Sequence, residues 1–444
     1  MEDLPVVVVG AGPQGLAAAA HLLERGARPL VLEMGTGPAA SVAEWSHVRL
    51  FSPWPELVDP AAARLLRGHG WEAPAEGYPT GGEWRERYLS PLAAALGDRV
   101  RYDTEVTGVS RRGRDRLVSA GRDQQPFTVH VRDAEGRESK LEGRAVVDAS
   151  GTWRQPNPAG ADGLPALGER GAAARGLLSH LPPTPEQVDR LAGRHVVVVG
   201  SGHSALTALN DLTGVVRAVP GTRVSWVLRR GGLGDTFGGG AADELAQRGA
   251  LGIRAREAVE AGLVDVITGF RVESVEQTGA GLVLVAQDGR RLTPAHRVVV
   301  LTGFRPDLSF LSELRLDLDP VLQSPRQLAA EIDPNLHSCG SVRPHGAAEL
   351  AQPEPGLYVV GMKSYGRAPT FLAITGYEQV RSVAAELTGD HGAAARVELT
   401  LPDTGVCGGA GLFDEPDPAV AGGCCSPAPS IGPDGRQEVA VSLR

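Results

Sequence analysis

The sequence predicts an α/β fold with two separate parallel sheets and a small antiparallel β-meander inserted into the first. Three observations support this. The order strand, glycine turn, helix occurs at Val6–Glu24 and again at His195–Leu212. Between them, residues 104–144 contain segments in which apolar and polar residues alternate. A glycine turn between a buried strand and a helix is typical of a Rossmann-like dinucleotide-binding domain, and alternation with period two indicates antiparallel strands.

Length and composition exclude several classes of protein. The 444 residues suffice for two to four domains, and 42% hydrophobic with 22% charged residues is typical of a folded chain. A net charge of −9 argues against a nucleic-acid partner. No apolar run reaches the roughly 18 residues that cross a bilayer, and the acidic start lacks the basic region of a secretory signal. We therefore expect a cytoplasmic protein with no membrane partner.

The first strand, Val6–Val9, runs into a glycine turn and then an alanine-rich helix from Leu16 to about Glu24. The glycines let backbone N–H groups approach a pyrophosphate, and the helix N-terminus favours its negative charge. The next strand, Pro29–Leu32, ends at Glu33, whose carboxylate can accept hydrogen bonds from both hydroxyls of an adenosine ribose. The residues predicted to bind this nucleotide are Gly10, Gly12, Pro13, Gln14, Gly15, Glu33 and Met34.

After the meander, the buried strand Ala145–Asp148 ends in a turn at Gly151, and residues 154–185 are rich in proline, glycine and alanine. Here we expect the chain to leave a first domain whose first part covers residues 1–165. The stretch from 190 to 308 is predicted to form the second domain, with a hairpin at 272–286 and a last strand, Arg297–Leu301, before a turn at Gly303.

The second glycine turn follows the strand Val196–Val199 and precedes a helix to about Leu212. The next strand, Arg223–Leu228, ends in two arginines where the first domain has an acid. Two cations suit the 2′-phosphate of NADP, through charge-assisted hydrogen bonds of about 1.5–3 kcal/mol each. Alternatively, both are surface charges and the site takes either nicotinamide. The predicted residues are Gly200, Ser201, Gly202, His203, Ser204, Arg229 and Arg230.

Two different dinucleotide sites on one chain predict electron transfer between two nucleotides. An FAD in the first domain can accept hydride from NADPH in the second when the two rings meet within about 3–3.5 Å. Trp45 and Arg49 are further candidates. Trp45 either walls the flavin or packs as local core, and Arg49 either hydrogen-bonds the flavin or a substrate anion, or is satisfied at the surface.

Four features in this order resemble the two-dinucleotide-domain flavoproteins, in particular the flavin-containing and Baeyer–Villiger type monooxygenases. They are the turn Gly10–Gly15 with Glu33, the segment Asp148–Trp153 with Pro156 and Pro158, the turn Gly200–Ala205, and the turn Thr302–Asp307. The resemblance implies a glutathione-reductase-like arrangement in which the second and fourth features are crossovers between the domains. It also implies that a last strand, Leu357–Gly361, and a helix from about Thr370 to Leu387 close over the flavin, so that Gly361 and Thr370 join the cofactor site within the returning part of the first domain, residues 309–395.

The sequence departs from that pattern at two points. The fingerprint that precedes the second glycine turn is only faintly echoed by Gly176–Leu181, and Gly361 is followed by Met362 where related disulfide reductases carry aspartate. More narrowly, Trp45–Trp54, His337–Gly340 and Leu401–Cys407 are similar to the flavin monooxygenases associated with arsenic-resistance operons.

The four cysteines lie late in the chain, three of them in a glycine- and proline-rich tail of residues 396–444 that we expect to be extended or disordered. No Cys-x-x-Cys or Cys-x4-Cys is present, so a dithiol relay has no residues to use. Thiolates favour soft, thiophilic ions. The adjacent pair Cys424-Cys425 is therefore either a ligand for such an ion or a chance feature of the tail. The predicted substrate-binding residues are Cys339, Cys407, Cys424 and Cys425.

We interpret the sequence as an NADPH-dependent, FAD-containing monooxygenase that uses molecular oxygen on a small, soft substrate, with a trivalent arsenical as the class to test first. One alternative is an NADPH-dependent reductase of a metalloid or of a partner's disulfide. Another is a flavoprotein sensor or metalloid-binding protein with little turnover. No acid–base side chain and no metal site are predicted, and a homodimer is left open.

Overall fold

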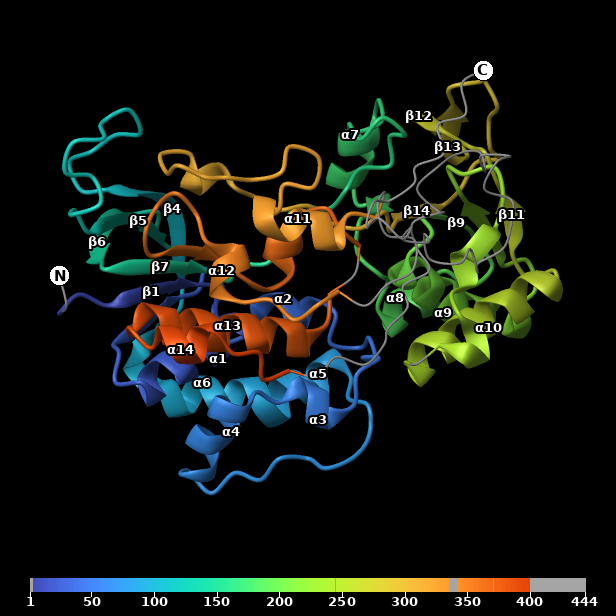
Figure 1. Ribbon diagram of the computed structural model, residues 1–444. Helices are drawn as coiled ribbons and strands as arrows, with labels where there is room; N and C mark the ends of the chain where they lie inside the picture. Colours follow the sequence, from blue (N-terminus) through green and yellow to red (C-terminus); the bar gives the residue numbers. More distant parts are fainter. Residues whose placement is uncertain (1–2, 244, 335–341, 370, 400–444) are drawn as a thin grey trace, which may run out of the picture.

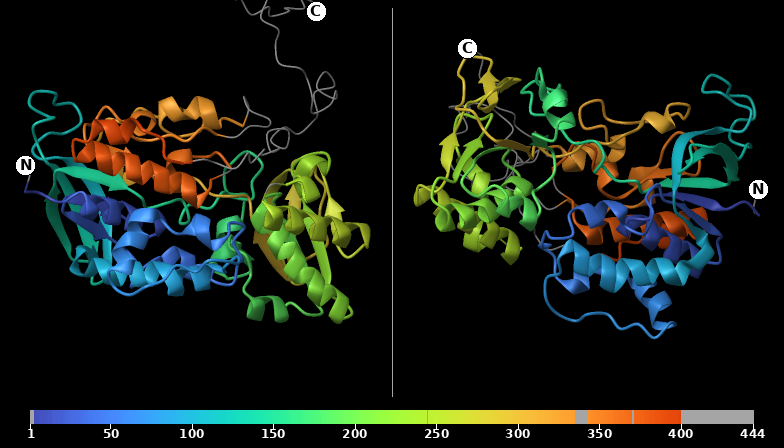
Figure 2. Two further views of the ribbon diagram at one scale, coloured as in Figure 1. Left: turned by 60° about the horizontal axis from the view of Figure 1, so that its bottom comes forward. Right: turned by 180° about the vertical axis from the view of Figure 1, so that it is seen from behind.

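The computed structural model describes residues 3–243, 245–334, 342–369 and 371–399. Figure 1 shows two lobes. The blue, cyan and orange-red elements form the first lobe, and the green and yellow elements form the second. The first lobe is thus assembled from two stretches far apart in the sequence, as Figure 2 shows from two further directions. No helix in these ranges is both long and apolar enough to cross a membrane.

The first lobe is built on a parallel sheet in which the strand order is β15-β7-β1-β2-β3. Its strands are β1 (Val6–Val9), β2 (Pro29–Leu32), β3 (Val100–Arg101), β7 (Ala145–Asp148) and β15 (Leu357–Val359). Val6 and Val8 of β1 pack into the core on one face, whereas Val7 and Val9 pack on the other. A strand buried on both faces has a continuous run of apolar residues, which is why the sequence alone predicts β1.

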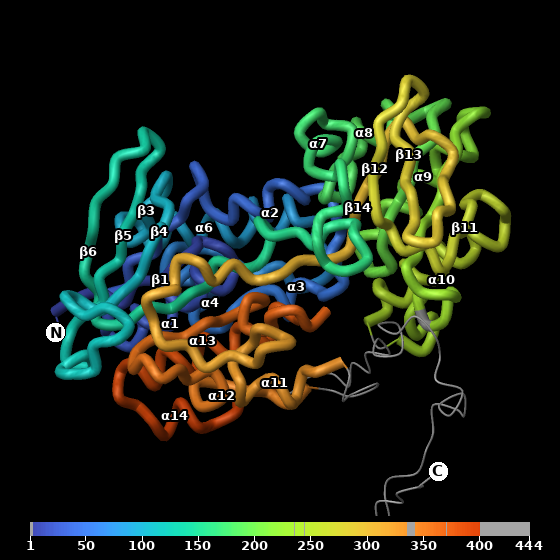
Figure 3. Tube along the Cα trace, turned by 90° about the horizontal axis from the view of Figure 1, so that it is seen from above, coloured from blue at the N-terminus to red at the C-terminus, as the bar shows by residue number. Residues whose placement is uncertain are grey.

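Helices cover one face of this sheet and the antiparallel meander covers the other. The helices are α1 (Pro13–Glu24), α2 (Ala40–Glu44), α3 (Trp54–Leu57), α4 (Pro60–Arg67), α5 (Gly81–Trp84), α6 (Ser90–Leu96), α11 (Arg326–Ile332), α12 (Ala347–Leu350), α13 (Ala373–Leu387) and α14 (His391–Ala395). The meander consists of β4 (Thr104–Arg111), β5 (Phe127–Asp133) and β6 (Glu138–Gly143). Figure 3 shows it on the side of the first lobe that is remote from the second.

The second lobe repeats this construction, with strand order β11-β10-β9-β14-β8 in a second parallel sheet. The strands are β8 (Leu178–Ser179), β9 (His195–Val199), β10 (Arg223–Val227), β11 (Asp265–Ile267) and β14 (Arg297–Val300). The helices α8 (Pro185–Asp189), α9 (His203–Ala218) and α10 (Ala246–Glu260) pack on one face. The helix α7 (Glu169–Ala174) and the hairpin of β12 (Val272–Thr278) and β13 (Gly281–Ala286) pack on the other.

The fold class predicted from the sequence is confirmed, with both parallel sheets, the meander and the hairpin in place. Some boundaries differ. Helix α1 begins at Pro13 rather than Leu16, and α9 continues to Ala218 rather than Leu212. Helix α13 begins at Ala373 rather than about Thr370.

Helix α10 was not expected at all, because its polar and apolar residues show no clear sidedness. Its glycines explain how it packs. A Cβ on Gly249 would lie 2.1 Å from the Gly240 carbonyl oxygen, and one on Gly252 would lie 1.8 Å from that of Phe237. Close backbone approach therefore replaces the apolar stripe by which an amphipathic helix is recognised.

Two crossover segments, residues 153–158 and 302–306, connect the lobes side by side. The Asn157 amide donates to the Gly303 carbonyl at 2.8 Å, and the Arg305 amide donates to that of Gln155 at 2.9 Å. The rings of Trp153 and Phe304 stack at 4.8 Å with an interplanar angle of 27°. The junction is thus a short antiparallel ribbon with an aromatic stack on it.

Candidate functional site

The first glycine loop, residues 10–15, lies between β1 and α1 at the carboxyl end of the first sheet. Gly10 has φ of 97°, and a Cβ there would lie 3.0 Å from the Ala149 carbonyl oxygen, so the loop is pressed against the end of β7. Apart from its neighbours in the chain, no described residue has an atom within 4 Å of the place where a Cβ on Gly12 would stand. Helix α1 starts with Pro13 and has no side-chain cap, which leaves its first N–H groups available to an anion.

Glu33 stands directly after β2 with its carboxylate held toward this loop. One oxygen accepts the Ala11 amide at 2.7 Å, and the other accepts the Gly35 amide at 2.8 Å. The next residue, Met34, is 41% exposed despite its apolar side chain. A fixed carboxylate beside an exposed apolar group suits the sugar and base of an adenosine.

Gln14 connects the first glycine loop to the returning part of the chain. Its Nε2 donates to the Ala373 carbonyl at the start of α13 at 3.1 Å. A Cβ on Gly361 or Gly376 would lie 2.9 or 2.4 Å from the Gln14 side chain, so both glycines make room for it. Gln14 Oε1 is buried and has no hydrogen-bond partner among the described residues. This orphaned acceptor, the open space at Gly12 and the uncapped helix together fit a bound dinucleotide.

The second glycine loop, residues 200–205, resembles the first in the conformation and packing of its first glycine. Gly200 has φ of 123°, and a Cβ there would lie 2.2 Å from the Leu301 carbonyl oxygen at the end of β14. The Trp226 indole N–H holds the Gly200 carbonyl at 2.7 Å. Among the described residues, none beyond the chain neighbours comes within 4 Å of a Cβ built on Gly202, and α9 begins at His203 without a side-chain cap. Gly202 and His203 are exposed, and Ser201 and Ser204 are half-buried.

Arg229 and Arg230 follow β10 at the same end of the second sheet, where Glu33 follows β2 in the first. Arg229 is exposed, and its guanidinium donates to the Ala161 carbonyl at 3.2 Å. The Arg230 carbonyl accepts the Gly269 amide at 2.6 Å, and its side chain is half-buried. The two glycine loops therefore have side chains of opposite charge at corresponding strand ends.

The other predicted cofactor residues are divided among several places. Gly151, Gly303 and Gly361, with φ of 69°, 90° and 70°, follow the ends of β7, β14 and β15, so all three lie at carboxyl ends of strands. Trp45 is half-buried and lies 6.4 Å from Trp153 between ring centroids. Thr370, Cys339, Cys407, Cys424 and Cys425 lie outside the described residues.

Arg49 turns toward its own lobe rather than toward either glycine loop. It donates to the Tyr78 carbonyl and lies 3.9 Å from the Glu83 carboxylate. Glu83 belongs to a capping box with Thr80 at the start of α5. Arg49 is more than half exposed, so its ion pair contributes little to stability.

Four contacts around the two glycine loops were not predicted from the sequence. The Gly361 amide donates to Gln379 Oε1 at 2.7 Å, and Gln379 Nε2 lies 2.7 Å from His345 Nε2. Trp226 anchors the second loop as described above. Phe51 packs edge-on against His203 of the other lobe, with centroids 5.1 Å apart. These contacts join residues distant in the chain and leave no local signal.

Comparison with known proteins agrees with this geometry. A profile of the pyridine nucleotide-disulphide oxidoreductase family matches residues 7–325, well over half of the chain and both glycine loops. The chain belongs to this family. It is a flavin-dependent oxidoreductase, and the predicted pairing of FAD with a reduced nicotinamide is confirmed at this level. No curated protein matches the chain significantly.

Solved structures of family-like enzymes share the fold. Bacillithiol disulfide reductase from Bacillus cereus is 19% identical with a TM-score of 0.65, and 87% of this chain covers 98% of that one. Thioredoxin reductase from Lactococcus lactis is 18% identical with a TM-score of 0.56, at 87% and 98% coverage. A variant of the flavin monooxygenase from Stenotrophomonas maltophilia is 20% identical with a TM-score of 0.55, at 87% and 99% coverage. Reductases and monooxygenases thus share this architecture.

Proposed function

We propose that this protein is an NADPH-dependent FAD monooxygenase that oxygenates a small, soft substrate. The assignment of FAD to the first loop and NADPH to the second rests on one observation, the different burial of the two glycine loops. Gln14 in the first loop is buried beneath the start of α13, whereas Gly202 and His203 in the second are exposed. A covered site suits a coenzyme that stays bound through many turnovers. An open site suits a nucleotide that must leave after each hydride transfer.

Each cofactor contact follows from the residues at the loops. Glu33 accepts hydrogen bonds from the ribose of FAD, and the free N–H groups at the start of α1 bind its pyrophosphate. The start of α9 binds the pyrophosphate of NADPH, while Arg229 and Arg230 bind its 2′-phosphate. Bound FAD supplies hydride acceptance and the reduction of oxygen. The chain itself binds and orients both nucleotides.

The distribution of cysteine favours an oxygenase over a dithiol reductase. The first cysteine in the chain is Cys339, so none occurs in the sequence that forms either glycine loop or either crossover. Electron relay through a protein disulfide requires a pair of cysteines close to the flavin. A second candidate, an NADPH-dependent reductase of a metalloid or partner disulfide, is supported by the family and by the similarity to bacillithiol disulfide reductase.

The substrate class that we propose is a trivalent arsenical, on the sequence alone. The thiolates of Cys339, Cys407 and the pair Cys424-Cys425 are soft ligands of the kind that thiophilic ions prefer. Replacing both Cys424 and Cys425 by serine is expected to raise KM for methylarsenite at least tenfold and to leave KM for NADPH unchanged. An unchanged KM for methylarsenite would contradict this assignment.

NADPH oxidation with and without oxygen separates the two candidates. In air, the proposal predicts that substrate accelerates NADPH consumption, that one atom of ¹⁸O₂ enters the product and that the other leaves as water. Without oxygen, consumption stops after one equivalent per bound flavin. Sustained anaerobic turnover with arsenate, methylarsenate or a bacillithiol-type disulfide would instead support the reductase. Arsenite, methylarsenite, an organic sulfide and a ketone form the substrate panel.

A further inference from the structure

A fully buried lysine lies beside the first nucleotide site. Lys363, one of only two lysines in the chain, belongs to the 3₁₀ turn Gly361–Tyr365 that follows β15. Its Nζ lies 2.6 Å from Asp148 Oδ2, and neither side chain has exposed surface. The ammonium also donates to Ser150 Oγ at 3.0 Å. Ser150 Oγ in turn donates to the second carboxylate oxygen of Asp148 at 2.6 Å.

Such a pair is an expensive way to stabilise a fold. Removing each ion from water costs several kcal/mol, which close attraction and extra hydrogen bonds only roughly offset. Apolar residues of similar volume would serve stability equally well. We therefore look to the location of the Lys363–Asp148–Ser150 unit for the reason that a buried ion pair is present.

That position is the point where the segments around the first glycine loop meet. Asp148 pairs with Val9 of β1 on one side and Val359 of β15 on the other. Ser150 lies against the loop itself, since a Cβ on Gly10 would be 3.0 Å from its Cα. On the other side, Lys363 is two residues past Gly361, whose backbone lies against Gln14.

The chain returning from the second lobe reaches the same ammonium. Lys363 Nζ lies 4.5 Å from the centroid of the Phe310 ring, a favourable cation–π distance. Burial raises the pKa of the nearby Asp307, but hydrogen bonds with Ser309 and the charge of Lys363 lower it overall. Asp148 and Ser150, just before the first crossover, and Asp307 and Phe310, just after the second, thus all lie close to Lys363.

We propose that Lys363 is a positioning residue of the FAD site. Its ammonium, through Asp148 and Ser150, fixes the turns at Gly151 and Gly361 on either side of the first glycine loop in the geometry that binds FAD. This role rests on the assignment of FAD to that loop in the proposed function. Lys363 acts through its partners and takes no part in electron transfer.

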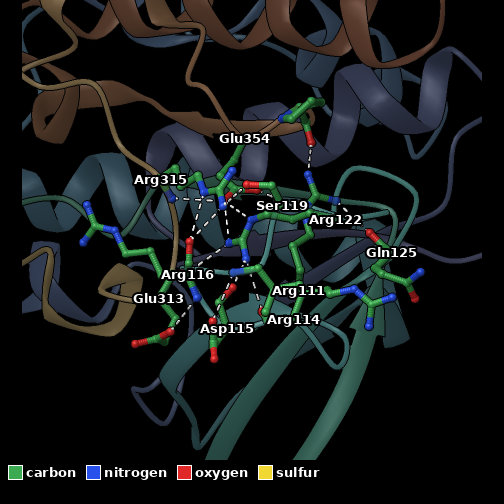
Figure 4. Close-up of polar contacts among 12 residues, drawn as sticks. Arg111, Arg114, Asp115, Arg116, Ser119, Arg122, Gln125, Glu313, Arg315 and Glu354 are labelled. Carbon is green, nitrogen blue, oxygen red and sulfur yellow. Dashed lines mark hydrogen bonds and ion pairs between the residues drawn. The ribbon is translucent and has the colours of Figure 1, made fainter.

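A second buried ion cluster provides a matched control (Figure 4). Glu354 lies 3.1 Å from Arg111 and 2.5 Å from Arg122, and all three side chains are at most 3% exposed. Arg122 also donates to the Glu313 carbonyl at 2.9 Å. This cluster ties the loop after β4 to the returning chain and touches neither glycine loop. Its loss reports the cost of a broken buried ion pair alone.

The test compares K363M, D148N, their double variant and E354Q with the wild-type holoenzyme. FAD dissociation is measured by the fluorescence of FAD released on dilution, and unfolding is followed separately by tryptophan fluorescence. K363M is expected to weaken FAD binding at least tenfold. The double variant is expected to bind FAD no more weakly than K363M, because Lys363 acts through Asp148. E354Q is expected to lower the unfolding temperature while leaving the FAD dissociation constant within twofold of wild type.

A K363M protein that is destabilised like E354Q but binds FAD as wild type does would overturn the proposal. If K363M does not fold, S150A removes only the hydroxyl that bridges the two charges. S150A is then expected to weaken FAD binding at least threefold, and an unchanged dissociation constant would overturn the proposal. A wild-type chain that binds no FAD would instead overturn the proposed function, a result that is distinct from either outcome above.

Discussion

The glycine loops at residues 10–15 and 200–205 have the same backbone geometry at their first glycine but differ in what packs over them. In each, the first glycine has positive φ and presses on a carbonyl just after the neighbouring strand, Ala149 or Leu301. The first loop is then covered by the returning chain through Gln14, whereas the second stays exposed at Gly202 and His203. The motif therefore sets the local backbone geometry of each loop, whereas the elements packed over it set its exposure. On the proposed function, this exposure decides whether the nucleotide stays or exchanges.

The largest effect is expected from the third position of each motif, where the loops differ. A Cβ on Gly15 would lie 1.9 Å from the Gly10 carbonyl oxygen, whereas the second loop carries Ala205 at this place. We expect G15A to lose about 3 kcal/mol of unfolding free energy and its bound flavin. The matched A205G should lose at most about 1 kcal/mol and keep its flavin. Urea unfolding measures the stability and visible absorbance measures the bound flavin. Similar losses in the two variants would contradict a different role for the third position in the two loops.

The next effect concerns the opposite charges at corresponding strand ends. Replacing Arg230 by alanine is expected to raise KM for NADPH about tenfold, the equivalent of about 1.4 kcal/mol, and to leave KM for NADH unchanged. Steady-state kinetics with both nucleotides provides the measurement. The control, E33Q, should weaken FAD retention and leave the ratio of the two KM values as it is. Equal rises for NADPH and NADH in R230A would contradict a 2′-phosphate contact.

The packing of the returning chain over the first loop should also weaken at low pH. Burial lowers the pKa of His345 below its ordinary value of about 6.5, although the Arg343 carbonyl and nearby carboxylates oppose the shift. In the folded protein, His345 binds a proton less readily than in the unfolded chain. The contribution of neutral His345 to the free energy of unfolding is therefore complete above about pH 6.5 and declines below it. FAD release should therefore rise as pH falls from 7.5 to 5, less steeply in H345Q than in wild type.

A matched control for this pH dependence is H391Q. His391 is exposed and lies remote from the first loop beside Glu386, which raises its pKa through a hydrogen bond. H391Q should therefore show the same acid-induced FAD release as wild type. If H345Q and wild type released FAD identically across the range, protonation of His345 would have no part in the cover.

The smallest effect is expected where the lobes touch. Phe51 of the first lobe packs edge-on against His203, an arrangement that contributes about 0.5–1.5 kcal/mol beyond buried area. F51A should lower the free energy of unfolding by this amount together with that of the lost apolar contact, and F51L, which keeps the apolar bulk, by less. Tryptophan fluorescence in urea detects the difference, while visible absorbance should show flavin retained in both. Loss of flavin in F51A would show that this contact supports the first loop instead.

Much of the fold was predictable because its signals are local. A strand buried on both faces, such as β1, gives an unbroken valine run, and the glycine turns that follow β1 and β9 need particular residues within a few positions. The charge difference between Glu33 and Arg229-Arg230 is local in the same sense. These features fixed the fold class and the positions of both loops.

The rest depends on contacts between distant segments. The pairing of Lys363 with Asp148 joins residues 215 positions apart, and Gln14 meets α13 across 359. Helix α10 packs through Gly249 and Gly252, which a hydrophobic pattern does not reveal. The sequence does contain one signal for Lys363. It is one of only two lysines and follows a buried strand, where a charged side chain needs a partner.

The most direct test asks which nucleotide stays with the protein. Purified holoenzyme is incubated anaerobically with excess NADP⁺ and passed through a desalting column, and the nucleotides in the protein fraction are released and quantified by chromatography. We expect about one FAD per chain and almost no NADP⁺, because the first loop is covered and the second is open. Protein that emerges with NADP⁺ bound and its FAD lost would contradict it.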